Sequence, residues 1–457
     1  MNERTGWPTI VAAAIIVTGF ATALAASWPG QLSYDSILQL LQGRTGIYNT
    51  WHPPVMAWLL GLGDTILPGT GLFLLFDAFL AFGALLSLLF LPSQRTRWAA
   101  PVVALVVALS PQLLIYQGLI WKDVLFADTS VAGFVCLAHA AERWHEVSAR
   151  AVLLTAGFLL LAIAALARQN GAVVLPFAAA GLGWIAARNG AAPVPSALLA
   201  AGLLGAGLAF VFTANVLLNL RSDGEPGTQE QLRLLQLYDL SGAVARQPGL
   251  ELARLANADP DFESVIRTRG AALYTPVRND PLASAADVQR ALVHADDAAI
   301  AAQWRDLILQ HPWLYLRNRA AVFGWVFLTP DIAACRPIFT GIEGPARELA
   351  QLGIAPRRDA RDLAMERYGK AFMGTPVLSH ASYAIVGLAC LILLLRRRRP
   401  ADIAFAALLG AAFAFTASFF VISISCDYRY LYALDLSAIA ALLYLARDPR
   451  SAFQGNP

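Results

Sequence analysis

The sequence predicts an all-α polytopic membrane protein with about ten transmembrane helices, outer-face interfacial helices and a small helical domain outside the membrane. Hydrophobic residues make up 57% of the 457 residues and charged residues only 14%, whereas a soluble globular protein carries about a quarter charged residues. Several apolar runs also reach the roughly 20 residues that a helix needs to cross the hydrocarbon core. A surface that largely faces lipid explains both observations.

Ten apolar segments are long enough to span a bilayer. We place them at 8–27, 71–92, 99–115, 124–141, 151–167, 171–187, 196–218, 377–395, 401–422 and 429–446. The first segment is longer than the apolar part of a usual signal peptide, and the positive charge of Arg4 is offset by Glu3. We therefore interpret it as a retained first helix.

The orientation follows from the arginines in the short connections, which favour the cytoplasmic side. If the N-terminus is cytoplasmic, the inner connections hold Arg95, Arg97, Arg143, Arg150, Arg188, the run 396–399, Arg447 and Arg450. The opposite orientation would place all of them outside. The sequence thus predicts a multi-pass inner-membrane protein with both termini in the cytoplasm.

Two larger segments then lie outside. The loop 28–70 contains a Trp-rich stretch, 51–68, which Gly, Asp and Pro interrupt before it reaches spanning length, so we expect a helix in the membrane interface. The region 219–376 is too polar to cross and too long for a plain loop. Its helical periodicity predicts a small helical domain, and its part 311–328 suits a helix on the membrane surface. The predicted domains are 1–218, 219–376 and 377–457.

Composition and residue spacing give no indication of nucleic-acid binding, metal binding or a disulfide framework. A net charge of +3 without a basic aromatic patch gives no indication of a nucleic-acid partner. The scattered cysteines have no metal-ligand spacing, and we expect no disulfide framework. They are Cys136, Cys335, Cys390 and Cys426. No compact cluster of acidic ligands is present, so no cofactor is expected and a divalent metal ion is not favoured.

Polar residues collect at the outer ends of the predicted spans. They are Asp35, Gln39 and His52 in the first loop, Tyr116, Lys122 and Asp123 after the third span, Arg168, Gln169 and Asn170 after the fifth, and Asp427 and Arg429 before the tenth. All four short or moderate outer loops thus bring ionisable groups to one depth. This common placement favours a functional site at the outer membrane surface.

Each of these residues also has a purely structural interpretation. Asp35 suits the N-cap of a helix, and the prolines after His52 suit the first turn of the next helix. Lys122 and Asp123 could form a solvated pair in a loop. The segment 168–171 could be a tight turn, and Arg429 could be a snorkelling side chain at the end of a span. Only their joint position argues for function.

The residues Tyr34-Asp35-Ser36, followed by Trp51-His52-Pro53-Pro54 after a first span, resemble the GT-C superfamily of integral-membrane glycosyltransferases. The protein O-mannosyltransferases of that group carry an early acidic residue and then a His-Pro-Pro motif. The motifs 121–123, 168–171 and 427–430 look like later outer-loop motifs of bacterial members. The resemblance covers roughly 1–220 and 377–446. One departure is the single acidic residue in the first loop, where many members have an acidic pair.

The resemblance implies that a sugar moves, with inversion, from a polyprenyl-phosphate carrier to a cell-envelope glycan, lipid or protein. Asp35 would be the catalytic base, and the donor phosphate would bind Lys122, Arg168 and Arg429. His52 would orient Asp35 or hold phosphate, and Asp123 would pair with Lys122 or assist the acceptor. Asn170 and Asp427 are further supporting residues. The other expected partners are membrane lipids.

Two other functions remain open. An outer-face polymerase or ligase of lipid-linked oligosaccharide also has many spans and a basic outer loop, but it would not need the early Asp and the His-Pro-Pro motif. A transporter would place polar groups at mid-membrane depth and would have broken helices in related halves, but the sequence shows no repeat. The interiors of the spans are nearly free of charge, with Asp77 as the main exception, and intramembrane acids are often functional.

Overall fold

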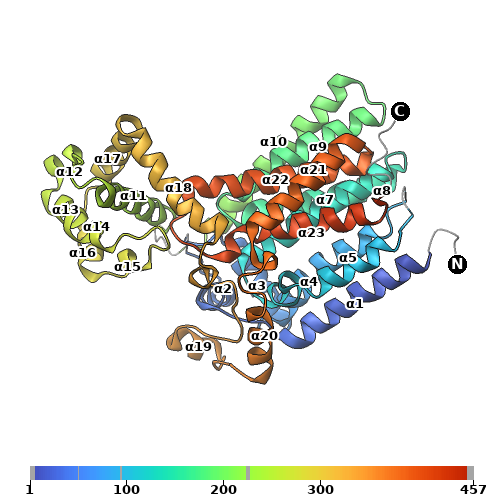
Figure 1. The fold of residues 1–457 in the computed structure, drawn as a ribbon, viewed down its shortest axis with the longest axis horizontal. Helices are drawn as coiled ribbons and strands as arrows, with labels where there is room; N and C mark the ends of the chain where they lie inside the picture. Colours follow the sequence, from blue (N-terminus) through green and yellow to red (C-terminus); the bar gives the residue numbers. More distant parts are fainter. Residues whose placement is uncertain (1–5, 50, 93–94, 223–226, 450–457) are drawn as a thin grey trace. The chain divides into compact units, whose positions relative to one another are not determined.

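The computed structural model describes residues 6–49, 51–92, 95–222 and 227–449 (Figure 1). Helices dominate this part of the chain, in which β-type pairing is limited to isolated bridges. The chain forms two compact units. Unit 1 contains Met1–Gly224, Ile338–Thr416 and Arg429–Pro457, and unit 2 contains Glu225–Pro337 and Ala417–Tyr428. The predicted division at 218/219 and 376/377 follows the two sides of a membrane and stays a prediction. The compact units divide the chain at other residues.

Unit 1 is a helical bundle. Its helices are α1 (Trp7–Ser27), α2 (Tyr34–Thr45), α3 (Val55–Ile66), α4 (Gly71–Leu88), α5 (Ala99–Ala108), α6 (Pro111–Leu114), η1 (Tyr116–Gly118), α7 (Lys122–Glu142), α8 (Val147–Ala167), η2 (Gly171–Val173), α9 (Val174–Arg188), α10 (Pro193–Asn219), α19 (Ala346–Leu352), α20 (Ala360–Lys370), η5 (Pro376–Leu378), α21 (His380–Arg397) and α23 (Tyr432–Ala446). Helix α22 (Pro400–Ile422) begins in unit 1, and η6 (Tyr428–Leu431) begins at the last residue of unit 2.

The helices of the described ranges confirm a multi-pass membrane protein. Nine are long and apolar enough to cross a membrane. They are α1, α4, α7, α8, α9 with η2, α10, α21, α22 and α23 with η6. The segment predicted as a span at 99–115 is bent, because α5 and the segment Pro111–Gly118 meet at 58°, and these two segments together would make a tenth span. Pro111 has no N–H to continue the helix and holds Ser110 in an extended conformation at ψ 147°.

The first outer loop contains a helix that is too short to span. Helix α3 has 12 residues, which corresponds to about 18 Å and falls short of a hydrocarbon core of roughly 30 Å. Its place at the membrane interface stays a prediction. Helix α3 packs closely on α2, because a Cβ on Gly43 would lie 2.2 Å from the carbonyl oxygen of Ala57. Only glycine allows this contact, which fixes how α2 is held.

The interior of unit 1 is built around two spans. For α7, 94% of the apolar window is buried inside the protein, and for α23 the share is 83%, against 11% for α10. Helix α7 packs against α4, α8 and α23. Helices α7 and α23 are therefore the core of the bundle, and α10 has the smallest buried share of these three spans.

Acidic side chains inside the spans are more numerous than the sequence analysis stated. Asp128 on α7 is completely buried and forms a hydrogen bond with Asp77 on α4. Its Oδ1 also accepts a hydrogen bond of 2.9 Å from Gln117. Asp435 on α23 is buried too and pairs with His380 at 2.9 Å. The description of Asp77 as the main exception is wrong, because α7 and α23 are largely enclosed by protein and can bury acids that lipid would exclude.

Unit 2 is also helical. Its helices are α11 (Gly227–Arg246), α12 (Ala253–Ala258), α13 (Pro260–Val265), η3 (Ile266–Gly270), α14 (Ala271–Leu273), α15 (Asp280–Ala283), α16 (Ala286–His294), α17 (Asp297–Gln310), α18 (Pro312–Leu328) and η4 (Ile332–Cys335). They confirm the helical character predicted for this region. In its interior, Arg319 pairs with Asp239, both side chains are completely buried, and Trp304 donates to Asp239 at 2.8 Å.

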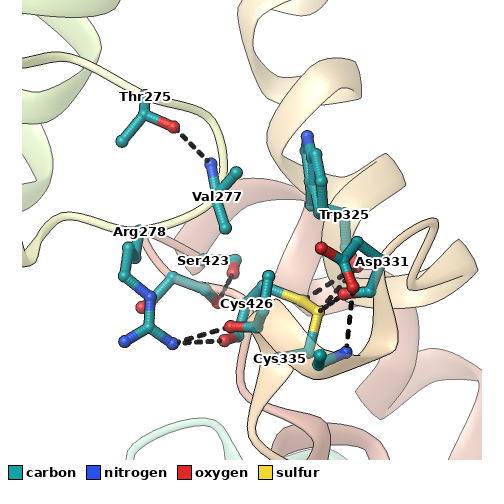
Figure 2. Close-up of a disulfide and its surroundings, with 11 residues drawn as sticks. Thr275, Val277, Arg278, Trp325, Asp331, Cys335, Ser423 and Cys426 are labelled. Atoms are coloured by element: carbon teal, nitrogen blue, oxygen red, sulfur yellow. Dashed lines mark hydrogen bonds between the residues drawn. A yellow bond between two sulfur atoms is a disulfide. The ribbon is translucent and has the colours of Figure 1, made fainter. Parts of the chain in front are cut away.

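A disulfide joins Cys335 to Cys426 inside unit 2 (Figure 2). The expectation of no disulfide is therefore wrong. The bonded residues are 91 positions apart, and their pairing depends on the fold, so spacing alone did not reveal it. The backbone N–H of Cys426 also donates to the carbonyl of Val277 at 2.5 Å. The segment before Arg429 is thus held by the rest of unit 2.

Candidate active site

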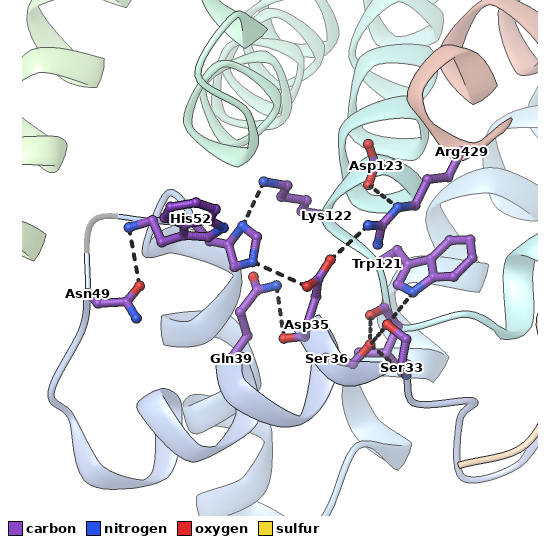
Figure 3. A network of polar contacts seen from close by, with 12 residues as sticks. Ser33, Asp35, Ser36, Gln39, Asn49, His52, Trp121, Lys122, Asp123 and Arg429 are labelled. Carbon is purple, nitrogen blue, oxygen red and sulfur yellow. Dashed lines mark hydrogen bonds and ion pairs between the residues drawn. The ribbon is translucent and has the colours of Figure 1, made fainter. Parts of the chain in front are cut away.

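The helix that carries Asp35 begins against the loop that leads into α7. Ser33 is the N-cap residue of α2, and its backbone N–H donates to Ser36 Oγ at 3.2 Å. The indole N–H of Trp121 donates to Ser33 Oγ at 2.8 Å (Figure 3). Interpreting Asp35 as the N-cap is therefore wrong. Asp35 lies in the first turn, and its side chain is left to point into the polar cluster.

His52 lies between Asp35 and Lys122. The Nζ of Lys122 is 2.8 Å from His52 Nδ1, and His52 Nε2 is 3.6 Å from Asp35 Oδ1 (Figure 3). Because an ammonium group can only donate, Nδ1 accepts and Nε2 carries the hydrogen. The ring thus presents its N–H to the Asp35 carboxylate. Pro53 and Pro54 directly precede α3, as the helix-start interpretation of the motif expects.

Arg429 connects two carboxylates. Its Nη2 is 2.8 Å from Asp35 Oδ2, and its Nε is 3.8 Å from Asp123 Oδ2 (Figure 3). Asp35 and Arg429 are 394 residues apart in the chain. The side chains remain partly accessible, with 25% of Asp35 and 15% of Arg429 exposed. A molecule from outside can therefore reach this pair.

Arg168 is the deepest cation of the cluster. It forms an ion pair with Asp123, and the exposed fractions of the two side chains are 7% and 2%. Asp123 thus pairs with Arg168. The pairing of Asp123 with Lys122, which the resemblance offered as one alternative, is not formed. The loop after Arg168 is tied to the His52 segment, since Gln169 donates to the carbonyl of Trp51 at 3.1 Å.

Aromatic side chains line the cations, a feature that the sequence analysis did not assign. The guanidinium carbon of Arg429 lies 4.9 Å from the centre of the Trp121 ring. Tyr430 lies 5.5 Å from the guanidinium of Arg168 and 5.9 Å from that of Arg429. Aromatic faces attract cations at such distances. The signal in the sequence was an aromatic residue directly beside Lys122 and beside Arg429.

The electrostatics of the cluster favour a charged Asp35 beside a neutral His52. Burial raises the pKa of Asp35, but the charge of Arg429 and the hydrogen bond from His52 together hold it well below its usual value. Burial and the charge of Lys122 lower the pKa of His52 to about 4. With His52 neutral and Lys122 protonated, the cluster holds two carboxylates and three cations. The excess of one positive charge suits an anionic ligand.

Six of the eight residues predicted for the site are in this cluster: Asp35, His52, Lys122, Asp123, Arg168 and Arg429. Asn170 is the residue before η2, two positions after Arg168. Asp427 belongs to unit 2. The parts of these two residues in the site stay predictions. In the described ranges, no three His, Cys, Asp or Glu side chains gather in a way that could hold a metal ion.

No family model matches the chain, and no curated protein matches it significantly. Solved structures of an oligosaccharyltransferase from Archaeoglobus fulgidus are similar to it. The enzyme AglB in complex with an inhibitory peptide and a dolichol-phosphate has a TM-score of 0.40 and 14% identity, covering 95% of this chain and 50% of that one. The apo oligosaccharyltransferase has a TM-score of 0.42 and 15% identity at the same coverage. The chain spans about half the length of each.

Proposed function

We propose that the chain is a GT-C-type glycosyltransferase that moves a sugar from a polyprenyl-phosphate carrier to an acceptor at the outer face of the bacterial inner membrane. The main support is the ion pair of 2.8 Å between Asp35 and Arg429, which belongs to a network with His52, Lys122, Asp123 and Arg168. The network joins the start of α7, the end of α8 and the start of α23. Two carboxylates and three cations therefore meet at one end of helices that can span a membrane.

This arrangement suits transfer to a hydroxyl group. The carboxylate of Asp35 takes the proton of the acceptor hydroxyl while the acceptor oxygen bonds to the anomeric carbon. The bond between that carbon and the phosphate oxygen breaks, and its electron pair stays on the phosphate. Because the acceptor attacks opposite the phosphate, the configuration at the anomeric carbon inverts.

The three cations would interact with the donor phosphate in different ways. Arg429 is the most accessible guanidinium of the cluster and would contact the phosphate as a fork. Lys122 supplies a second positive charge and holds His52, and Arg168 adds charge from a deeper position. Negative charge grows on the phosphate as the bond breaks, so cations placed there stabilise the transition state more than the bound donor. Asn170 and Asp427 would support these groups.

The disulfide of unit 2 supports an outer location for that part of the chain. Disulfides persist in oxidising compartments and are rare in the cytoplasm. Cys335 lies in the segment that the arginine pattern places outside, and Cys426 lies at the predicted outer start of the last span. We accordingly place both termini in the cytoplasm, 219–376 outside, and the acceptor in the cell envelope as a glycan, a lipid or a protein.

The test is sugar transfer from labelled polyprenyl-phosphate sugar in membranes that contain the protein. Replacing the base, Asp35→Asn, should lower the rate on the order of 100-fold or more, the usual contribution of general base catalysis. Arg429→Ala should both weaken donor binding and slow transfer. The matched control is Asp64→Asn in the same outer loop, because Asp64 pairs with Arg44 at 2.6 Å outside the cluster. If Asp35→Asn transfers as fast as Asp64→Asn, Asp35 is not the base.

A further inference from the structure

The proposed base is already occupied in this structure. One oxygen of Asp35 receives Arg429 at 2.8 Å, and the other faces the N–H of His52 at 3.6 Å (Figure 3). Burial alone would raise the pKa of Asp35, but the charge of Arg429, first among the opposing influences, helps to hold it well below its usual value. Because basicity falls with pKa, a carboxylate held in this way is a poor proton acceptor.

The proposed phosphate clamp is occupied by the same contact. Arg429 uses Nη2 for Asp35 and directs Nε at Asp123, while the face of its guanidinium covers Trp121. A phosphate that binds a guanidinium as a fork needs two of its N–H groups along one edge. Both edges of the guanidinium that can form a fork contain Nη2, and Asp35 already binds this nitrogen. A phosphate that binds either edge therefore competes with Asp35 for Nη2.

We propose that the donor phosphate displaces Asp35 from Arg429, and that this exchange frees the Asp35 carboxylate to accept the proton of the acceptor. The inference rests on the proposed function and adds an order to it, in which donor binding precedes activation of the base. No covalent bond changes in the exchange. Arg429 gives up one anionic partner and gains another, so its charge stays compensated.

The neighbouring contacts allow this exchange without a loss of order. Asp123 stays bound to Arg168, and its second oxygen still faces Arg429 Nε at 3.8 Å. When Asp35 leaves, Asp123 thus remains beside Arg429 and keeps its guanidinium oriented. The ring of His52 stays fixed by Lys122 at 2.8 Å and continues to present its N–H to Asp35. The released carboxylate remains oriented, with only its strongest cationic partner removed.

The exchange predicts an uncommon effect on binding. Asp35→Asn should bind the donor phosphate about fivefold more tightly than the wild-type protein, because the phosphate no longer has to replace a partly exposed ion pair. The probe is polyprenyl monophosphate without sugar, titrated calorimetrically into purified full-length protein in detergent. Asp64→Asn should bind as the wild type does, and Arg429→Ala should bind more weakly.

Asp35→Ser is a second variant in case asparagine impairs folding, since serine suits the first turn of a helix. Gel filtration in detergent checks that both variants are correctly folded. Unchanged or weaker binding by correctly folded Asp35→Asn and Asp35→Ser would overturn the exchange. Transfer measurements separate this result from failure of the proposed function. Tighter binding with normal transfer would retain the exchange and reject Asp35 as the base. Lost transfer with unchanged binding would retain Asp35 as the base and reject the exchange.

Discussion

The ammonium group of Lys122 donates a hydrogen bond of 2.8 Å to Nδ1 of His52, and this contact determines which nitrogen of the ring faces Asp35. The same ammonium group and the burial of the ring oppose protonation of His52. Both effects can be tested through the dependence of stability on pH.

Protonation of His52 should destabilise the folded protein as the pH falls. Its pKa is about 4 in the folded protein, against an ordinary value of 6.5. The unfolded chain therefore takes up the proton first, and stability that is complete above pH 6.5 is lost between pH 6.5 and 4. The loss amounts to about 3 kcal/mol. Thermal unfolding from pH 8 to 4 should show a steeper decline for the wild type than for His52→Gln; parallel curves would contradict the neutral ring.

Removal of one partner from the buried ion pair of unit 2 should be strongly destabilising. Arg319 and Asp239 are both completely buried, so Asp239→Asn leaves a buried charge with less compensation and should lower stability by about 3–5 kcal/mol. The matched control is Asp306→Asn, whose partner Arg254 is 59% exposed, and an exposed pair contributes less than about 1 kcal/mol. Thermal unfolding in detergent should rank the two variants in this order.

The buried acid pair of unit 1 should tolerate an amide better than an apolar residue. Asp77 forms its hydrogen bond with Asp128 inside the bundle, and Asp77→Asn retains a group that can donate to that carboxyl. Asp77→Leu leaves Asp128 without this partner and should lower stability by about 1–3 kcal/mol. Melting temperatures of the two variants should differ accordingly. Equal stability would show that the hydrogen bond is unimportant.

Reporter fusions should establish the orientation of the chain. Fusions after residues 95 and 398 should report the cytoplasm, and a fusion near residue 280 should report the outer compartment, because arginines of short connections stay inside. Paired reporters, one active on each side of the membrane, provide the control. A cytoplasmic signal at 280 would invert the topology and place the cluster around Asp35 on the opposite face.

Hydropathy was sufficient to predict the spans, because a segment that crosses a membrane is predominantly apolar even where it holds a buried acid. The grouping of Asp35, Lys122, Arg168 and Arg429 followed from the same topology, since alternate connections share one side. The individual pairings did not follow. Whether Asp123 meets Lys122 or Arg168 depends on the rotation of α7 about its axis, which packing determines. For the same reason, the partner of Cys335, 91 residues away, could not be identified.

The discontinuity of unit 2 in the chain has a practical consequence for biochemical dissection. A fragment that ends at Pro337 would contain Cys335 without Cys426 and Arg278 without the Cys426 carbonyl, its acceptor at 3.5 Å. Arg319 would also lose the carbonyl of Ser423, to which it donates at 2.6 Å. Such a fragment would have a free thiol at Cys335, and each of the two guanidinium groups would lack one of its acceptors. Expression of this region as an independent piece therefore requires 417–428 to be supplied as well, and its purification requires buffers without thiol reductants.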